Sequence, residues 1–194
     1  NTWLAHALAL SLGAPAGAAL VAAALFAVHP IHTESVAFVS GRTDLWAALL
    51  GLASALLWAR GRSAAGGRRR LLLLSAVAIA LGGLAKETVL VLPAFLLAWD
   101  ALAPREARDG IAGWWRRTRE PLLFWALGVT AVLAARWAAG VALGVTSGGL
   151  PRSIALPAML WNLRLLVLPY PSNAFYTLNQ VPVDPLTILA APAA

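Results

Sequence analysis

The chain has 194 residues, of which 60% are hydrophobic and only 12% are charged. A soluble globular domain usually carries about 45–50% apolar and about 25% charged residues, so this composition excludes an ordinary soluble enzyme and predicts an integral membrane protein. The net charge of +7 does not indicate a nucleic-acid partner, because most arginines lie in short segments between apolar stretches. The absence of cysteine excludes disulfides, thiolate metal ligands and cysteine nucleophiles.

Apolar stretches along the chain predict membrane-embedded helices, since about 20 apolar residues are needed to cross the hydrocarbon layer. They fall, in chain order, at residues 2–12, 15–28, 44–59, 71–85, 88–103, 120–143, 154–169 and 186–194. Gly13 suits a helix C-terminus and Pro15 the first turn of the next helix, so a tight turn is expected between the first two stretches. The stretch that carries Arg164 lies between two prolines and either spans or re-enters the membrane. The predicted fold is all-α, a polytopic bundle of about 6–8 membrane-embedded helices.

Arginines predict how this bundle is oriented. The segments RGRSAAGGRRR (60–70) and PREARDGIAGWWRRTR (104–119) contain ten of the fifteen basic residues, and two apolar stretches separate them. Both segments should therefore lie on one side, which the positive-inside rule makes cytoplasmic. Residues 29–43, the turn near Lys86 and residues 141–153 are then expected on the opposite, non-cytoplasmic face.

Residues 29–44, HPIHTESVAFVSGRTD, gather polar side chains directly after an apolar run. A helical two-histidine metal site is disfavoured there, because Pro30 opposes a helical conformation at His29. A purely structural explanation is that Thr33 caps a helix beginning at Glu34. Polar groups beside a bilayer are costly, so a site that faces a ligand is the preferred interpretation.

Further charges interrupt the apolar stretches at three places. Arg42 and Asp44 form either a surface salt bridge or a phosphate-facing arginine held by an acid. Lys86, the only lysine, and Glu87 stand in a short turn, where an ion pair indicates function unless both side chains reach the headgroups. Arg136 lies near the outer end of its stretch, where snorkelling to the interface explains it equally well. Together these mainly basic groups suit an anionic ligand whose tail stays in lipid, such as a lipid-linked phosphate.

Two long segments carry a resemblance to a known family. FAVHPIHTESVAFVSGRTDLWAALL (26–50) has the pattern HP-x-H-x-E-x-V followed by G-R-x-D before an apolar helix. LAKETVLVLPAFLLAWD (84–100) places a Lys-Glu pair between two spans, and PYPSNAFYTL (169–178) is a looser match. These segments resemble the multi-pass membrane glycosyltransferases of the transmembrane and tetratricopeptide-repeat O-mannosyltransferase type and their bacterial relatives.

The resemblance implies a GT-C type fold with its active site on the non-cytoplasmic face. It implies transfer of a sugar, mannose or another hexose, from a polyprenyl or dolichyl phosphate to an acceptor hydroxyl on a protein or glycan. The acidic base of such enzymes lies in a first outer loop, which would precede Asn1, and their tetratricopeptide repeats would follow residue 194. Residues 1–194 are therefore expected to be part of one transmembrane glycosyltransferase domain, truncated at both ends and lacking the base.

The expected donor-site residues are cations, carboxylates and histidines at the outer ends of predicted spans. They are Arg42, Lys86, Glu34, Glu87, His29, His32, Asp44 and Arg136. Arg42 and Lys86 would stabilise the departing phosphate, with Arg136 as a lesser candidate, because preorganised cations favour a transition state that develops negative charge. The glutamates would orient these cations or bind sugar hydroxyls, and the histidines would donate hydrogen bonds. No metal ligand is assigned and the only cofactor-like molecule expected is the lipid-phosphate-linked sugar, although a divalent metal is compatible with the chemistry.

Two other functions fit part of the pattern. A transporter or flippase for a lipid-linked or anionic substrate would also explain charges among broken helices, but the inverted repeat that would support it is not found. A non-catalytic scaffold would use the charged pairs only to fix helix packing. The expected partners are membrane lipid, the sugar donor and an acceptor, but no nucleic acid. The alanine, arginine and glycine content indicates a bacterial inner membrane, with the site on its outer face.

Overall fold

The structure, a computed structural model, describes residues 1–64, 66–102, 110–140, 160 and 163–164, without the side chains of residues 34 and 40. Within these ranges every regular element is helical and no strand is found, which confirms the all-α prediction. The elements are α1 (Thr2–Ser11), α2 (Ala16–Val28), η1 (Pro30–His32), α3 (Thr33–Ala37), η2 (Val39–Gly41), α4 (Arg42–Ser63), α5 (Arg68–Ala85), η3 (Glu87–Val91), α6 (Leu92–Leu102) and α7 (Gly110–Ala138), where η marks a 3-10 helix.

The predicted stretches and the observed helices agree over most of the described chain, but α7 begins at Gly110, ten residues before the stretch predicted at 120–143, so residues 110–119 are helical and not a loop. The turn expected between the first two stretches is present, because Gly13 adopts a left-handed φ of 95° and Pro15 directly precedes α2. α4 continues beyond the predicted end at residue 59, since the side chain of Arg62 is held by an ion pair to α6. Of the stretch at 154–169 only Leu160, Leu163 and Arg164 are described. The stretch at 186–194, the turn at 141–153 and residues 169–178 lie outside the described residues.

The length of the helices limits how many can cross a bilayer alone. In the described ranges, α7 is long and apolar enough to span, and α2 together with η1 and α3 forms a second such unit if their 46° bend belongs to one broken span. α1, α2 and α6 have 10, 13 and 11 residues, which corresponds to a rise of about 15–20 Å each. A hydrocarbon layer is about 30 Å thick, so none of these three crosses it singly. The predicted count of 6–8 embedded helices stays a prediction.

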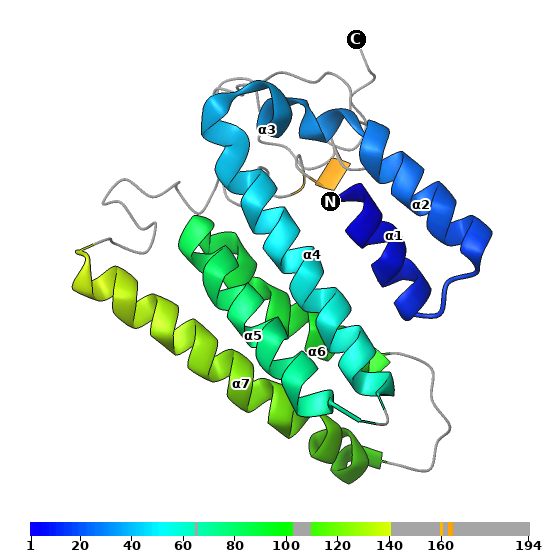
Figure 1. The fold of residues 1–194 in the computed structure, drawn as a ribbon, viewed down its shortest axis with the longest axis vertical. Coiled ribbons are helices and arrows are strands. Elements are labelled where there is room, and N and C mark those ends of the chain that lie inside the picture. The colour runs from blue at the N-terminus through cyan, green and yellow to red at the C-terminus, as the bar shows by residue number, and fades with distance from the viewer. Residues whose placement is uncertain (65, 103–109, 141–159, 161–162, 165–194) are drawn as a thin grey trace.

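The core forms where α5 packs between α4 and α7 (Figure 1). Trp58 of α4, Leu72 and Ile79 of α5 and Trp125 of α7 are almost completely buried there, and the two indole rings lie 6.3 Å apart between centroids. The α1–α2 hairpin covers another side of α4. Large apolar side chains also point outward, and Leu102, Ile111 and Trp137 are each more than 80% exposed. Such an apolar exterior is unusual in soluble proteins and is suited to contact with lipid.

Charged residues gather at the two ends of this bundle. We call the first the arginine end, where α4 and α6 end and α5 and α7 begin, and the second the motif end, where α4 begins and α5 and α7 end. Ion pairs join helices at both ends: Arg62 to Asp100 at the arginine end, and Lys86 to Asp44 at the motif end. Arg68 of the first arginine-rich segment donates to the carbonyl oxygen of Arg117 in the second, so the described parts of the two segments lie together, as their spacing predicts. The side of a membrane that they face stays a prediction.

Candidate functional site

Two ion pairs meet at the motif end, and both depend on how α5 ends. Lys86 has an extended backbone, with φ −156° and ψ 128°, and its amide still donates to Gly82 of the last helical turn at 2.8 Å. This single extended residue sends neighbouring side chains to different helices. Lys86 Nζ contacts Asp44 Oδ1 in the first turn of α4, whereas Glu87 Oε2 lies 3.4 Å from Arg136 Nη2 in the last turn of α7. The Lys-Glu dipeptide therefore links α4, α5 and α7 at one place.

The four charged side chains differ in their access to solvent. Asp44 and Lys86 are 36% and 39% exposed and Glu87 is 46% exposed, but Arg136 is only 15% exposed. The Nε atom of Arg136 is buried and makes no hydrogen bond within the described part of the chain. A guanidinium carries five donors, and its ion pair to Glu87 engages Nη2. Arg136 therefore keeps donor capacity for an anion that enters this end.

The two histidines lie in the short segment that leads to the motif end. Pro30 keeps His29 extended, and His29 Nδ1 accepts a hydrogen bond from the amide of Ile31 at 3.2 Å, which caps η1. The proton of a neutral His29 therefore lies on Nε2, which is the nitrogen that can donate. The centroid of the His32 ring lies 4.6 Å from that of the Phe26 ring and 6.2 Å from that of the His29 ring. Thr33 was considered as the cap of a helix beginning at Glu34, but it is itself the first residue of α3, so that prediction was wrong. The capping side chain in this segment is that of His29, and the donor role proposed for His29 falls on its Nε2.

Two predicted partners in the glycine-arginine-aspartate motif are not paired with each other. Asp44 binds Lys86, while Arg42 is the first, exposed residue of α4. Residues two positions apart on a helix do not face the same direction, so the predicted ion pair between Asp44 and Arg42 was wrong. The backbone of Glu34 lies in α3, but its side chain is outside what the structure describes, so its role stays a prediction.

An apolar groove of about 490 Å³ begins at Asp44, the partner of Lys86. Asp44 and Thr88 line it together with side chains of α1, α4 and α6, among them Leu92 and Phe95. Most of the residues that α4 contributes to the lining are small: Ala47, Gly51 and Ala55 recur every four residues and form one stripe along the helix, with Leu52 beside them. This groove was not among the features predicted from the sequence. The spacing of these small residues directly after the polar motif was the signal that could have revealed it.

A metal centre is not formed by the residues that the structure describes. Within them, no group of three or more histidine, aspartate or glutamate side chains converges as metal ligands would. Asp44 and Glu87 each bind a cation of the protein. The need for a divalent metal therefore stays untested.

Comparison with known proteins finds relatives of one kind. The chain is 36% identical over 104 residues to protein O-mannosyl-transferase TMTC1 of Mus musculus, covering 50% of this chain and 11% of that protein. It is 44% identical over 93 residues to protein O-mannosyl-transferase Tmtc2 of Drosophila melanogaster, covering 46% and 10% respectively. A shorter match, 64% identical over 39 residues, joins it to protein O-mannosyl-transferase TMTC4 of Homo sapiens, covering 20% and 5%.

These matches support the resemblance to that family over about half of the chain. The chain spans only about a tenth of the length of the mouse and fly proteins. No family model matches the chain, and no solved structure matches it either. The expected GT-C fold and the expected bacterial relatives therefore stay predictions.

Proposed function

We propose that this chain is part of a multi-pass membrane glycosyltransferase that moves a sugar from a polyprenyl or dolichyl phosphate to an acceptor hydroxyl. The observation that carries the proposal is that Asp44, the partner of Lys86, lines an apolar groove, while the adjacent Glu87 holds Arg136 at the same end of the bundle. The names of the relatives support glycosyl transfer, and mannose is the sugar that those names contain. The acceptor is a protein or a glycan.

The cations of the motif end match the electronic demand of this reaction. When the bond between the anomeric carbon and the phosphate oxygen breaks, the electron pair leaves with the phosphate, and negative charge grows there. Lys86 and Arg136 are held in place by carboxylates before any ligand arrives, so they need little reorganisation to stabilise that charge. Arg42, exposed at the start of α4, adds a third cation at this end. Lys86 has three donors and can bind a phosphate while it keeps its contact with Asp44.

The apolar groove matches the lipid half of such a donor. A phosphate bound by Lys86 would place its isoprenoid chain beside Asp44, where the groove begins, and the chain would then follow the small residues of α4 toward α6. Leu92 and Phe95 offer the apolar surface that an isoprenoid tail requires. His29 and His32 lie on the segment before α4 and would donate hydrogen bonds to sugar hydroxyls. Glu34 and Glu87 would accept hydrogen bonds from such hydroxyls.

The proposed orientation of the bundle in the membrane follows from the charges at its two ends. The arginine end faces the cytoplasm under the positive-inside rule, so the motif end and its sugar donor lie on the non-cytoplasmic face. In a bacterium this is the outer face of the inner membrane. We assign no catalytic base among residues 1–194, which form a portion of one transmembrane domain.

The experiment measures sugar transfer by the full-length protein in sealed membrane vesicles. Radiolabelled mannose or glucose on polyprenyl phosphate is supplied, and label leaving the lipid is followed for wild type and for the Arg42→Ala, Lys86→Ala double variant. Removing cations that stabilise the leaving phosphate should lower the rate by about 100-fold or more. The matched control is the Arg60→Ala, Arg70→Ala variant, which removes two exposed cations at the arginine end and should keep nearly the wild-type rate.

Three results would count against the proposal. A wild-type rate in the Arg42→Ala, Lys86→Ala variant, with folding verified by thermal unfolding, would remove the phosphate role of these residues. An equal loss in the control variant would show a general effect of charge. Labelled donor that crosses the bilayer with its sugar still attached would identify a flippase in place of an enzyme.

A further inference from the structure

A second cavity lies at the arginine end, on the opposite side of the bundle from the proposed donor site. Its volume is about 330 Å³, and it is lined by the last turns of α1, α4 and α6, the first turns of α5, and residues 117–121 of α7. Arg62, Arg68 and Arg117 line it, together with the single carboxylate of Asp100. Three arginines and one carboxylate line the cavity; together with Arg69 and Glu120, which pair beside it, four arginines stand against two carboxylates among the described residues, so an excess of positive charge remains.

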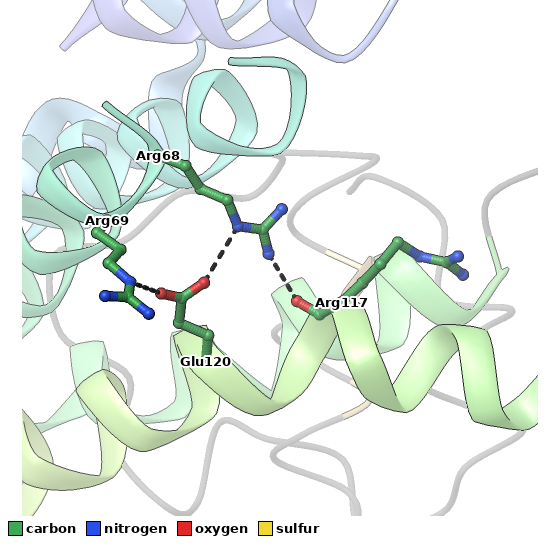
Figure 2. A network of polar contacts seen from close by, with 4 residues as sticks. All are labelled: Arg68, Arg69, Arg117 and Glu120. Carbon is green, nitrogen blue, oxygen red and sulfur yellow. Dashed lines mark hydrogen bonds and ion pairs between the residues drawn. The ribbon is translucent and has the colours of Figure 1, made fainter. Parts of the chain in front are cut away.

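The arginines are held in fixed positions before any ligand binds. Arg62 Nη2 lies 2.9 Å from Asp100 Oδ1, and its guanidinium carbon lies 4.8 Å from the centre of the Trp58 ring. Figure 2 shows Arg68 between two acceptors of α7: its Nε lies 3.3 Å from Glu120 Oε2 and its Nη2 donates to the carbonyl oxygen of Arg117 at 2.9 Å. Arg69 takes the other oxygen of Glu120 at 2.9 Å, so one carboxylate is shared by two arginines.

The surroundings indicate where the ligand comes from. Trp58 and Trp99 line the same cavity, and tryptophan is enriched where a membrane protein passes from hydrocarbon to headgroups. Leu72 and Pro121 form apolar parts of the wall, while Ser63 adds a hydroxyl. A lipid headgroup meets this combination of cations, indole rings and apolar surface, whereas a free anion would use only the cations.

We propose that this cavity binds the phosphate of an anionic phospholipid from the leaflet at the arginine end. Guanidinium groups prefer phosphate because their planar fork donates two parallel hydrogen bonds. Basic pockets between membrane helices on the cytoplasmic side hold anionic headgroups, and the excess of cations here favours a lipid of net negative charge over a zwitterionic one. The inference rests on the proposed membrane location of this end, but not on sugar transfer, which takes place at the other end.

The experiment counts lipids bound to the full-length protein by native mass spectrometry after delipidation in a neutral detergent. Phosphatidylglycerol is compared with phosphatidylcholine of the same acyl chains, and inorganic phosphate is added as a competitor. The test variant is Arg68→Gln with Arg117→Gln. Arg62 is left intact because its removal would take an ion-pair partner from the buried carboxylate of Asp100, while Glu120 keeps Arg69 when Arg68 is replaced. The matched control, Arg60→Gln with Arg70→Gln, removes two exposed cations at the same end that do not line the cavity.

Wild type should retain phosphatidylglycerol in preference to phosphatidylcholine, and excess inorganic phosphate should not displace it. Each cavity arginine contributes about a fivefold increase in affinity, so the test variant should bind about 25-fold more weakly, and the control should stay near wild type. Equal weakening in both variants would show diffuse surface charge, displacement by inorganic phosphate would show a free-anion site, and equal retention of phosphatidylcholine would show no charge selection. Each of these three results would overturn the proposal.

A second measurement decides the matter if the test variant does not fold. A phosphatidylglycerol with a photoreactive headgroup, crosslinked to the wild-type protein, should label peptides that contain Trp58 or Arg68. Labels confined to peptides of the motif end would contradict the inference. Neither measurement uses sugar transfer, so failure of the proposed enzyme activity and failure of this lipid site can be told apart.

Discussion

At the scale of the residue, a single backbone conformation organises the candidate site. Lys86 is extended between α5 and η3, and this directs Lys86 toward Asp44 of α4 and Glu87 toward Arg136 of α7. Had α5 continued, adjacent side chains would have been separated by about 100° around one helix and could not have reached both neighbours in this way. The functional interest of the Lys-Glu dipeptide thus comes from the break in the helix as much as from its charges.

Another residue-scale feature lies in the core, where polar atoms satisfy one another. Ser54 Oγ and Ser75 Oγ are 2.8 Å apart, and Trp125 Nε1 donates to Ser75 Oγ at 3.1 Å. Both serines are completely buried. Ser75 therefore stands at the centre of a small network that joins α4, α5 and α7.

We predict that Ser75→Ala destabilises the protein more than Ser54→Ala does. Loss of Ser75 leaves the Trp125 N–H and the Ser54 hydroxyl without this partner in the core, which should cost about 1–3 kcal/mol. Ser54→Ala leaves the bond between Trp125 and Ser75 intact and should cost about 1 kcal/mol. Thermal unfolding in detergent measures both, and a larger loss for Ser54→Ala would show that the network has a different centre.

At the scale of the element, small residues determine how closely the helices approach. Gly128 of α7 faces α5, where a Cβ atom would lie 3.1 Å from the backbone oxygen of Ala76. Gly51 of α4 faces the open groove, and a Cβ there would lie 3.8 Å from the nearest atom of Leu92. Small residues that let backbones approach are a common means of packing helices in membranes. Gly128 therefore allows two helices to approach closely, whereas Gly51 leaves space in the groove.

Gly128→Ala should destabilise the fold, whereas Gly51→Ala should not. The first substitution forces α7 away from the α5 backbone and should cost about 1–3 kcal/mol, which is typical of overpacking. The second fits within ordinary contact distance and improves helix propensity, so stability should rise by up to about 1 kcal/mol. The midpoints of thermal unfolding compare the two variants. A stable Gly128→Ala protein would mean that α5 and α7 are packed less closely than described here.

At the scale of the whole molecule, the two charged ends stand apart by about the thickness of a membrane. α4 carries Asp44 at one end and Arg62 at the other, and eighteen residues of helix rise about 27 Å, close to the roughly 30 Å of a hydrocarbon layer. Between these positions the bundle exposes mainly apolar side chains. The arrangement fits a protein whose donor site and whose proposed phospholipid site lie at opposite membrane surfaces.

This orientation predicts which residues a membrane-impermeant thiol reagent reaches. Val39, in η2 near the motif end, is 72% exposed, and Gly66, at the arginine end, is also exposed. The chain has no cysteine of its own, so Val39→Cys and Gly66→Cys each report a single position of it. In intact cells Val39→Cys should react, and Gly66→Cys should react only after the membrane is opened. Labelling of both positions from the same side would contradict the proposed topology.

Local patterns in the sequence were sufficient to place most of the long helices and the polar segments, but not the short helices between residues 30 and 41 or the start of α7 at Gly110. Apolar stretches predict helices over residues 2–12, 15–28 and 44–59 because their side chains must be removed from water whatever they pack against. Gly13 and Pro15 mark a turn for purely local steric reasons. The sequence also indicated that Asp44 and Lys86 belong to a site, because charged side chains beside apolar runs cost free energy unless they have partners or a function.

Only the tertiary structure decided which charges pair and where space remains. The sequence places Asp44 beside Arg42, but the fold brings Lys86 to it from 42 residues away. The apolar groove and the arginine-lined cavity are volumes left between helices, so they depend on how α1, α4 and α6 approach one another. An ion pair or a cavity is a property of atoms that are close in space, and a linear pattern records only those that are close along the chain.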